Sequence, residues 1–177
     1  ALNLHKAGYP LTVHARRPES MTPLAAAGAT TAASPAGCAA RSDVVFTMVS
    51  DTPDVEEVIF GRGGVAEGIA PGGVVVDMST ISPSATRSMA ERLAQQGVQM
   101  LDAPVSGGDL GAINGTLSIM VGGEATAFER VLPLLRVLGL RHPVGVDHEQ
   151  VAGAHDPLLL LVADLRHDAQ NRSHGSE

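Results

Sequence analysis

The sequence predicts an α/β fold built on a doubly wound, mostly parallel sheet. Short apolar runs rich in β-branched residues alternate with longer Ala-rich stretches, which is typical of repeated strand-helix-strand units. Several of these runs are hydrophobic without interruption, as strands covered on both faces usually are. The 177 residues are enough for one domain with a sizeable core, or for two small domains at most.

Six segments have the composition of strands. Three of them contain unbroken apolar triplets, at 44–46, 74–76 and 119–121, so we expect these three to be buried on both faces. In chain order the six predicted strands are Leu11–Ala15, Asp43–Val49, Val74–Asp77, Val98–Leu101, Thr116–Val121 and Arg141–Gly145.

The helices between these strands are predicted from their first residues. A hydroxyl side chain suits the N-cap, and proline suits the first helical position, where its missing N–H costs nothing. Three pairs fit this rule: Ser34-Pro35, Thr52-Pro53 and Ser82-Pro83. A fourth helix follows Gly123, where the apolar residues Phe128, Val131, Leu132 and Leu135 form one stripe, and we expect Pro133 to divide it.

Composition excludes several classes of function. The 19 acidic residues outnumber the 12 basic ones and no block of Lys or Arg occurs, so neither nucleic acid nor an anionic membrane is an expected partner. The single Cys38 cannot form a disulfide framework or a Cys-x-x-Cys metal site. No apolar run approaches the ~20 residues of a membrane span. Nothing at the N-terminus resembles a signal peptide, so a cytoplasmic protein is expected.

The residues that follow the predicted strands are candidate ligand contacts, because open α/β sheets bind ligands beyond the carboxyl ends of their strands. Arg16 and Arg17 follow the first predicted strand. A guanidinium there can pair with the 2′-phosphate of NADP, whereas a carboxylate would favour NAD. The alternative is a solvated basic turn before Pro18. Ser50-Asp51 and Met78-Ser79-Thr80 follow the next two strands, and a helix cap at either place can also offer free N–H groups to a ligand.

The most specific segment is Asp102-Ala103-Pro104-Val105-Ser106-Gly107-Gly108. Its glycines let backbone amides approach an anionic group closely, and the Ser106 hydroxyl is a further donor. More glycines follow, up to Gly122-Gly123. A loop without a ligand could also contain many glycines, but it would rarely combine them with this order of Asp, Pro and Ser. The segment therefore predicts a cradle for a carboxylate or a phosphate.

On these residues the sequence resembles the β-hydroxyacid dehydrogenases, the family of 3-hydroxyisobutyrate dehydrogenase, 2-hydroxy-3-oxopropionate reductase and related glyoxylate reductases. The resemblance runs from Ala1-Leu2-Asn3-Leu4 and Ala7-Gly8, through Asp77-Met78-Ser79-Thr80, to the block Asp102–Gly123. It implies that residues 1–145 form a Rossmann-like, NADP-binding domain with a substrate loop.

The resemblance also implies roles for particular residues. The family binds substrate through its Asp-Ala-Pro-Val-Ser-Gly-Gly signature, so Ser106, Gly107 and Gly108 would hold the carboxylate of a small oxo- or hydroxy-acid. Members that prefer NAD usually carry Asp near the position of Arg16, so NADP is the implied cofactor and NAD remains possible. The implied cofactor-binding residues are Arg16, Arg17, Ser50, Asp51 and Thr80. Full-length relatives are expected to be homo-oligomers.

The N-terminus departs from the family pattern. Members begin with a strand and a G-x-G-x-x-G turn that binds the pyrophosphate, whereas this sequence begins inside the helix that follows. The expected sheet therefore lacks its first strand, which would lie centrally between Leu11–Ala15 and Asp43–Val49. Loss of that strand would remove about 8–15 kcal/mol of apolar burial, which rivals the stability of a whole domain. We therefore expect a fragment or a mis-started reading frame.

The C-terminal part departs as well. The family continues with a helix of pattern G-x-G-Q-x-x-K-x-x-N, whose Lys is the general acid and whose Asn orients the substrate. Aligning Gln150–Asp156 with this pattern places Gly153 at the Lys position and Asp156 at the Asn position, so no catalytic residue is implied. We expect 146–165 to be a degenerate start of this inter-domain helix and 166–177 to be a disordered tail. The histidines nearby fit no standard metal-ligand spacing.

The expected function is therefore that of an NADP-dependent oxidoreductase that reduces a small oxo-acid such as 2-hydroxy-3-oxopropionate. Loss of a positioned acid would slow this chain by ~10²–10⁴-fold. One alternative is a non-catalytic dinucleotide-binding module or pseudoenzyme. An imine reductase, which has a similar arginine-based NADP site, is another, although imine reductases generally lack the Asp102–Gly108 signature. A structural α/β protein without a ligand is the third.

Overall fold

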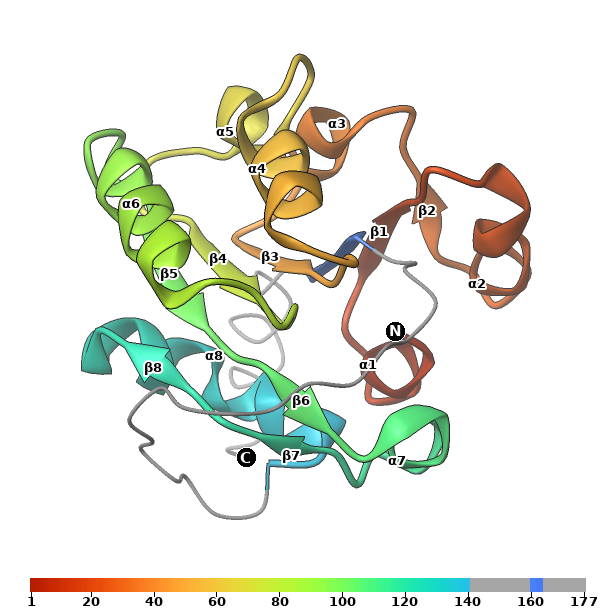
Figure 1. Cartoon of the computed structure of the whole chain (residues 1–177). Helices are drawn as coiled ribbons and strands as arrows, with labels where there is room; N and C mark the ends of the chain where they lie inside the picture. The colour runs from red at the N-terminus through yellow and green to blue at the C-terminus, as the bar shows by residue number, and fades with distance from the viewer. Residues whose placement is uncertain (141–159, 164–177) are drawn as a thin grey trace, which may run out of the picture.

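The computed structural model of the protein defines residues 1–140 and the strand at 160–163. Its main feature is a seven-stranded sheet of order β2-β1-β9-β3-β4-β5-β8 (Figure 1). β3, β4 and β5 are parallel to one another, and β1 is parallel to β2. In the order of the sheet the strands are β2 (Thr30–Thr31), β1 (Leu11–His14), β9 (Leu160–Ala163), β3 (Val44–Thr47), β4 (Val74–Asp77), β5 (Gln99–Asp102) and β8 (Gly122–Gly123).

The predicted fold class, a Rossmann-like and mostly parallel sheet, is confirmed. The central strands β3 and β4 are buried along their whole length, as their unbroken apolar runs predict. Alternate side chains enter two separate cores: Val44 and Phe46 face one side of the sheet, whereas Val45 faces the other. This period of two, with both faces covered, is what the doubly wound arrangement requires.

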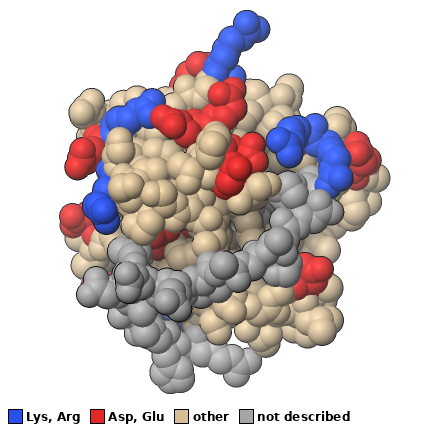
Figure 2. Space-filling model, viewed as in Figure 1, with Lys and Arg blue, Asp and Glu red and all other residues tan. Residues whose placement is uncertain are grey.

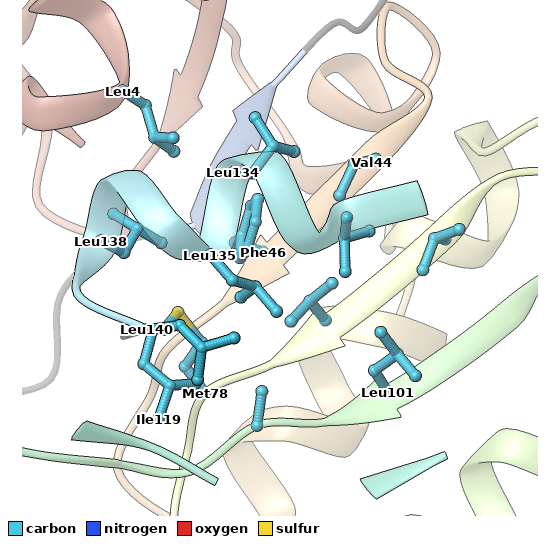
Figure 3. Packing of buried hydrophobic residues seen from close by; sticks show 14 of the residues in the cluster. Leu4, Val44, Phe46, Met78, Leu101, Ile119, Leu134, Leu135, Leu138 and Leu140 are labelled. Atoms are coloured by element: carbon cyan, nitrogen blue, oxygen red, sulfur yellow. The ribbon is translucent and has the colours of Figure 1, made fainter. Parts of the chain in front are cut away.

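Helices cover both faces of the sheet (Figure 1). One core contains buried side chains from α3 (Pro35–Ala39), α4 (Thr52–Phe60), α5 (Val65–Gly68) and α6 (Pro83–Ala94). The other contains side chains from α1 (Leu2–Lys6), α2 (Thr22–Ala26) and α8 (Ala125–Leu138). Figure 3 shows this second core, in which Leu134 and Leu135 of α8 lie near Val44 and Phe46.

The centre of the sheet corrects one prediction. β9 lies between β1 and β3 and runs antiparallel to both, so the position expected for the first strand of the usual order is filled from near the other end of the chain. Residues 160–163 are thus a strand, although they belong to the segment 146–165 that we expected to be a degenerate start of the inter-domain helix. The physical reason is that β1 and β3 would otherwise leave two central rows of unpaired backbone groups.

The predicted strand Thr116–Val121 is also corrected. Only Ser118–Ile119 (β7) is a strand there, and it pairs with β6 (Val105–Ser106) in a separate antiparallel sheet of two strands. The apolar triplet at 119–121 is therefore not a central strand: Ile119 is buried, but the next two residues are only half-buried. The predicted strand Arg141–Gly145 lies outside the described residues.

The predicted helix starts are confirmed within one residue. Ser34 caps α3, because its Oγ accepts the N–H of Gly37 at 3.1 Å. α4 is capped by Asp51 rather than by Thr52, since the Asp51 carboxylate accepts the N–H of Asp54 at 3.1 Å. α6 begins at Pro83 after Ser82, whose side chain makes no capping bond.

α8 differs from the prediction in two ways. It is one continuous helix, with Pro133 inside it rather than dividing it. Pro133 is on the exposed side, where water can satisfy the carbonyl that loses its partner. The buried stripe is also rotated from the predicted one, so that Phe128 and Leu132 are only half-buried. The residues that fill the core are Ala127, Val131, Leu134, Leu135 and Leu138.

Candidate dinucleotide- and acid-binding edge

The carboxyl ends of four strands meet at one edge of the sheet. β3, β4 and β5 are parallel, and β1 has the same direction as β3 because both are antiparallel to β9. The loops that follow β1, β3, β4 and β5 therefore lie along one edge, where open α/β sheets bind their ligands. Every predicted binding residue within the described part of the chain lies in one of the segments that follow these strands.

Arg16 and Arg17 follow β1, directly before a 3₁₀ turn at Pro18–Met21. Arg16 reaches across to the start of α4, with its Nη1 3.6 Å from Oδ1 of Asp54. The Arg16 side chain is 75% exposed, so this ion pair is a weak one that an incoming anion can displace. Both arginines thus directly follow the strand beside whose end a ribose phosphate would bind.

Ser50 and Asp51 form the loop between β3 and α4, and both are exposed. The Asp51 carboxylate is already committed to the N–H of Asp54. This bond satisfies one of the free N–H groups of the first turn of α4. Asp54 is a neighbour of Arg16 that the sequence did not single out.

The loop after β4 contains Thr80, which is exposed, and Ser79, which is 2% exposed. The Ser79 hydroxyl accepts the N–H of Val49 at 3.0 Å, so the loops after β3 and β4 are joined directly. A second link lies nearby, where the N–H of Ser82 donates to Oγ1 of Thr52 at 3.2 Å. The structure therefore brings the predicted loops of Ser50-Asp51 and Thr80 together.

Asp77, the last residue of β4, is the buried group behind these loops. Its Oδ1 accepts three hydrogen bonds, from Oγ1 of Thr47 at 2.7 Å, from Oγ of Ser79 at 2.7 Å and from the N–H of Ser79 at 3.1 Å. Burial raises the pKa of Asp77 to about 6. The hydrogen bonds from Ser79 and Thr47 act to lower this pKa, whereas the charge of Asp102 on the neighbouring strand acts to raise it. Sequence reasoning did not assign Asp77 a role, although a carboxylate ending an apolar run is a visible signal.

The predicted acid-binding loop follows β5. Ser106 is exposed on β6, and α7 (Gly108–Asn114) begins two residues later, with Gly107 at its N-cap. Gly107 and Gly108 have φ of 127° and 58°, values that favour glycine. A Cβ placed on Gly108 would meet no atom within 4 Å, so the backbone here faces open space that a ligand can enter. The structure thus places Ser106, Gly107 and Gly108 together at the binding edge.

Asn3 is a further residue that the sequence did not single out at this site. Its Nδ2 donates to the carbonyl oxygen of Ala112 at 2.8 Å and so joins α1 to the C-terminal turn of α7. The same amide packs against Gly115, which ends α7 in a left-handed conformation. The acid-binding loop is therefore anchored to the first helix of the chain.

The residues of this edge fit a dinucleotide at two points. Two guanidinium groups suit a ribose 2′-phosphate, and the open backbone at Gly108 suits a small anionic substrate. Between these points, the described residues offer no glycine-rich strand-to-helix turn for a pyrophosphate, because the strand between β1 and β3 is the antiparallel β9. Gly153 and Asp156, at the family's Lys and Asn positions, lie outside the described residues, as does the tail from 166.

One face of the described chain is mixed in charge. On the face in Figure 2, basic and acidic groups are interspersed among larger uncharged areas. None of the described helices is long and apolar enough to cross a membrane. The described residues also contain no group of three or more His, Cys, Asp or Glu side chains that could hold a metal ion.

A doubly wound sheet with its loops gathered at one carboxyl edge defines the class of nucleotide-binding α/β domains. The family described as the NAD binding domain of 6-phosphogluconate dehydrogenase matches residues 1–145. The chain belongs to this family, and its resemblance to the β-hydroxyacid dehydrogenases is confirmed.

Three similar proteins illustrate the relationship. The 2-hydroxy-3-oxopropionate reductase of Escherichia coli is 46% identical over 78% of this chain and 47% of its own length. The structure of Mycobacterium tuberculosis 3-hydroxyisobutyrate dehydrogenase with L-serine matches with a TM-score of 0.69 at 32% identity, over 77% of this chain and 46% of that one. The structure of Psf3 in complex with NADP+ and 2-OPP matches with a TM-score of 0.76 at 30% identity, over 81% and 51%. The chain thus spans about half the length of these relatives.

Proposed function

We propose that this chain is the NADP-binding and acid-binding part of an oxidoreductase that reduces a small oxo-acid such as 2-hydroxy-3-oxopropionate. The observation that carries the proposal is the gathering of Arg16, Arg17 and the Ser106–Gly108 loop on one edge of the sheet. The reductase from Escherichia coli, with 46% identity, supports the same class of substrate. The bound cofactor would supply hydride, and the loop would hold the substrate carboxylate near it.

The cofactor preference rests on the two arginines. A guanidinium can pair with a 2′-phosphate through two hydrogen bonds, whereas NAD offers only a neutral hydroxyl at this position. The exposed ion pair between Arg16 and Asp54 is weak enough to yield to a phosphate. We therefore expect the chain to bind NADPH more tightly than NADH.

Titration of the 177-residue chain with NADPH and NADH, followed by calorimetry, tests this preference. Replacing both Arg16 and Arg17 by Ala should lower the affinity for NADPH by about 10- to 100-fold, since a charge-assisted hydrogen bond contributes about 1.5–3 kcal/mol. The affinity for NADH should change little. Arg92→Ala is the matched control, because Arg92 pairs with Glu56 and lies over Phe60 between α4 and α6. Equal affinities for NADPH and NADH in the unchanged chain would contradict the proposal.

Addition of a small oxo-acid with NADPH then separates the enzyme from its principal alternative. Oxidation of NADPH at an ordinary enzymatic rate supports the reductase. Binding of NADPH without turnover supports the non-catalytic binding module. A melting temperature that does not change with millimolar NADPH supports a structural protein without this ligand.

A further inference from the structure

The carboxyl ends of β3 and β4 carry a buried polar cluster whose members come from both strands and from the loop that follows. Thr47 and Asp77 are direct partners in the register of the two strands, and each is the last residue of its strand. Ser79 follows Asp77 after one intervening residue, and its hydroxyl donates to Oδ1 of Asp77. Thr47 and Asp77 are 0% exposed and Ser79 is 2% exposed, so the cluster is sealed from solvent.

All three hydrogen bonds of the cluster meet at a single oxygen, Oδ1 of Asp77. The other oxygen, Oδ2, is buried and has no hydrogen-bond partner among the described residues. Burying a carboxyl group in this way is costly, and a Val pair at this register position would fill the sheet at lower cost. Because burying this carboxyl group is costly, we infer that its role lies in the loops that the cluster connects.

The cluster connects three loops of the binding edge. The Ser79 hydroxyl donates to Asp77 and also accepts the N–H of Val49 from the loop after β3. The carbonyl oxygen of Asp77 accepts the N–H of Ala103 at 2.7 Å, where the loop after β5 begins. The side chain of Asp77, through Ser79, and the backbone carbonyl of Asp77 thus fix the first residues of the loops that carry Ser50, Thr80 and Ser106.

We propose that Asp77, Thr47 and Ser79 form a positioning unit that holds the loops at 48–51 and 78–81 in the single relative arrangement from which they bind a dinucleotide. This proposal rests on the proposed function for its ligand, and on the hydrogen bonds of the cluster for its mechanism. None of the three side chains is exposed, so the unit acts through the loops and not by touching the ligand.

Two serines provide a matched test. Ser79→Ala removes the hydroxyl that joins the two loops. Ser42→Ala removes another buried hydroxyl, which donates to the carbonyl oxygen of Cys38 at 3.0 Å before β3 begins, at the opposite edge of the sheet. Hydrogen exchange in the ligand-free chain, read by mass spectrometry, should accelerate at 48–52 and 78–82 by about tenfold in Ser79→Ala, as expected for the loss of about one hydrogen bond. In Ser42→Ala the exchange of these two loops should stay unchanged.

Affinity for NADPH is the second measurement. It should fall by about tenfold in Ser79→Ala and in Thr47→Val, and by less than twofold in Ser42→Ala at a comparable loss of melting temperature. Asp77→Asn keeps a hydrogen-bond acceptor at the position of Oδ1, so it should retain slow hydrogen exchange of the two loops and affinity for NADPH. Asp77→Leu has no acceptor there and should lose both.

The outcomes are distinct. If the loops exchange no faster in Ser79→Ala, or if affinity follows melting temperature equally in the Ser79 and Ser42 variants, the positioning unit is overturned. If the unchanged chain binds no NADPH, the proposed function fails, while loop exchange alone still supports or overturns the unit.

Discussion

At the scale of single residues, Asp77 is a buried carboxyl group whose protonation is changed by folding. Its pKa is raised from 3.8 to about 6, chiefly because it is removed from water. The folded state therefore holds the proton more tightly than the unfolded chain does. The resulting stabilisation is fully present below pH 4 and is lost as the pH rises through about 6.

This equilibrium predicts a pH-dependent difference between the unchanged chain and Asp77→Asn, which cannot ionise there. Between pH 3 and pH 7 the unchanged chain should lose about 3 kcal/mol of unfolding free energy relative to the variant, because one pKa unit corresponds to about 1.36 kcal/mol. Urea denaturation at several pH values measures the difference. Parallel stability curves for the two proteins would contradict the assigned pKa.

A second variant examines the charged neighbour of Asp77. Asp102 on β5 lies directly across from Asp77 in the register of the sheet, and its charge contributes to the raised pKa, whereas Thr47 on β3 is neutral and donates a hydrogen bond. Asp102→Asn should therefore move the pH-dependent loss of stability toward lower pH. A shift toward higher pH would show that the interaction has the opposite sign.

At the scale of elements, α8 contributes most visibly to the core on its face of the sheet (Figure 3). Leu135 is 0% exposed, so Leu135→Ala should lower the unfolding free energy by about 2–5 kcal/mol. Leu110 on α7 is 74% exposed, and Leu110→Ala should change it by less than about 0.5 kcal/mol. Urea denaturation of the two variants compares the same chemical change in two environments. Similar losses in both would mean that α8 does not pack as described.

The elements also show how far local sequence signals reach. The apolar runs of β3 and β4 and the start of α3 agree with their predictions, because local composition and capping chemistry determine them. The predictions failed at β7 and at Pro133. Within the described part of the chain β7 pairs with β6 alone, a partner that its own apolar run does not reveal. Pro133 is tolerated because the rotation of α8 turns it toward solvent, and the packing of the whole helix sets that rotation.

At the scale of the whole molecule, β9 joins the two parts of the sheet. β1 and β3 pair with β9 and not with each other, so the ladder between the β2-β1 part and the β3-β4-β5 part runs through Leu160–Ala163. A central strand tolerates proline poorly, because proline has no N–H to donate. This arrangement makes the stability of the fold depend on a segment far from β1 in the sequence.

Val162 pairs with Thr12 on one side and with Val45 on the other, which makes it a test of this dependence. Val162→Pro should destabilise the chain by at least about 1–3 kcal/mol more than Val162→Ala, which keeps the backbone N–H. Thermal unfolding followed by circular dichroism compares the two variants. Equal melting temperatures would show that β9 does not complete the sheet.

The candidate site was predictable in part for the same reasons. Arg16, Arg17, Ser50 and Thr80 became candidates because they follow apolar runs, and Ser106 because it lies in the glycine-rich segment, while their binding roles came from the family resemblance. The sheet does place the loops of all five on one edge. Asp77 and Thr47 were not assigned. A carboxylate that ends an apolar run is visible in the sequence, but its hydrogen-bond partner is not known until the register of the two strands is known.

The sequence by itself determined the alternation of buried strands and helices and the identity of the loops that follow the strands, because side-chain burial and helix capping act over a few neighbouring residues. Only the tertiary structure decided that β9 fills the centre of the sheet and that one buried carboxyl joins the loops of the binding edge. Both depend on hydrogen bonds between residues about 30 to 150 positions apart, and the local pattern of the chain does not record such pairings.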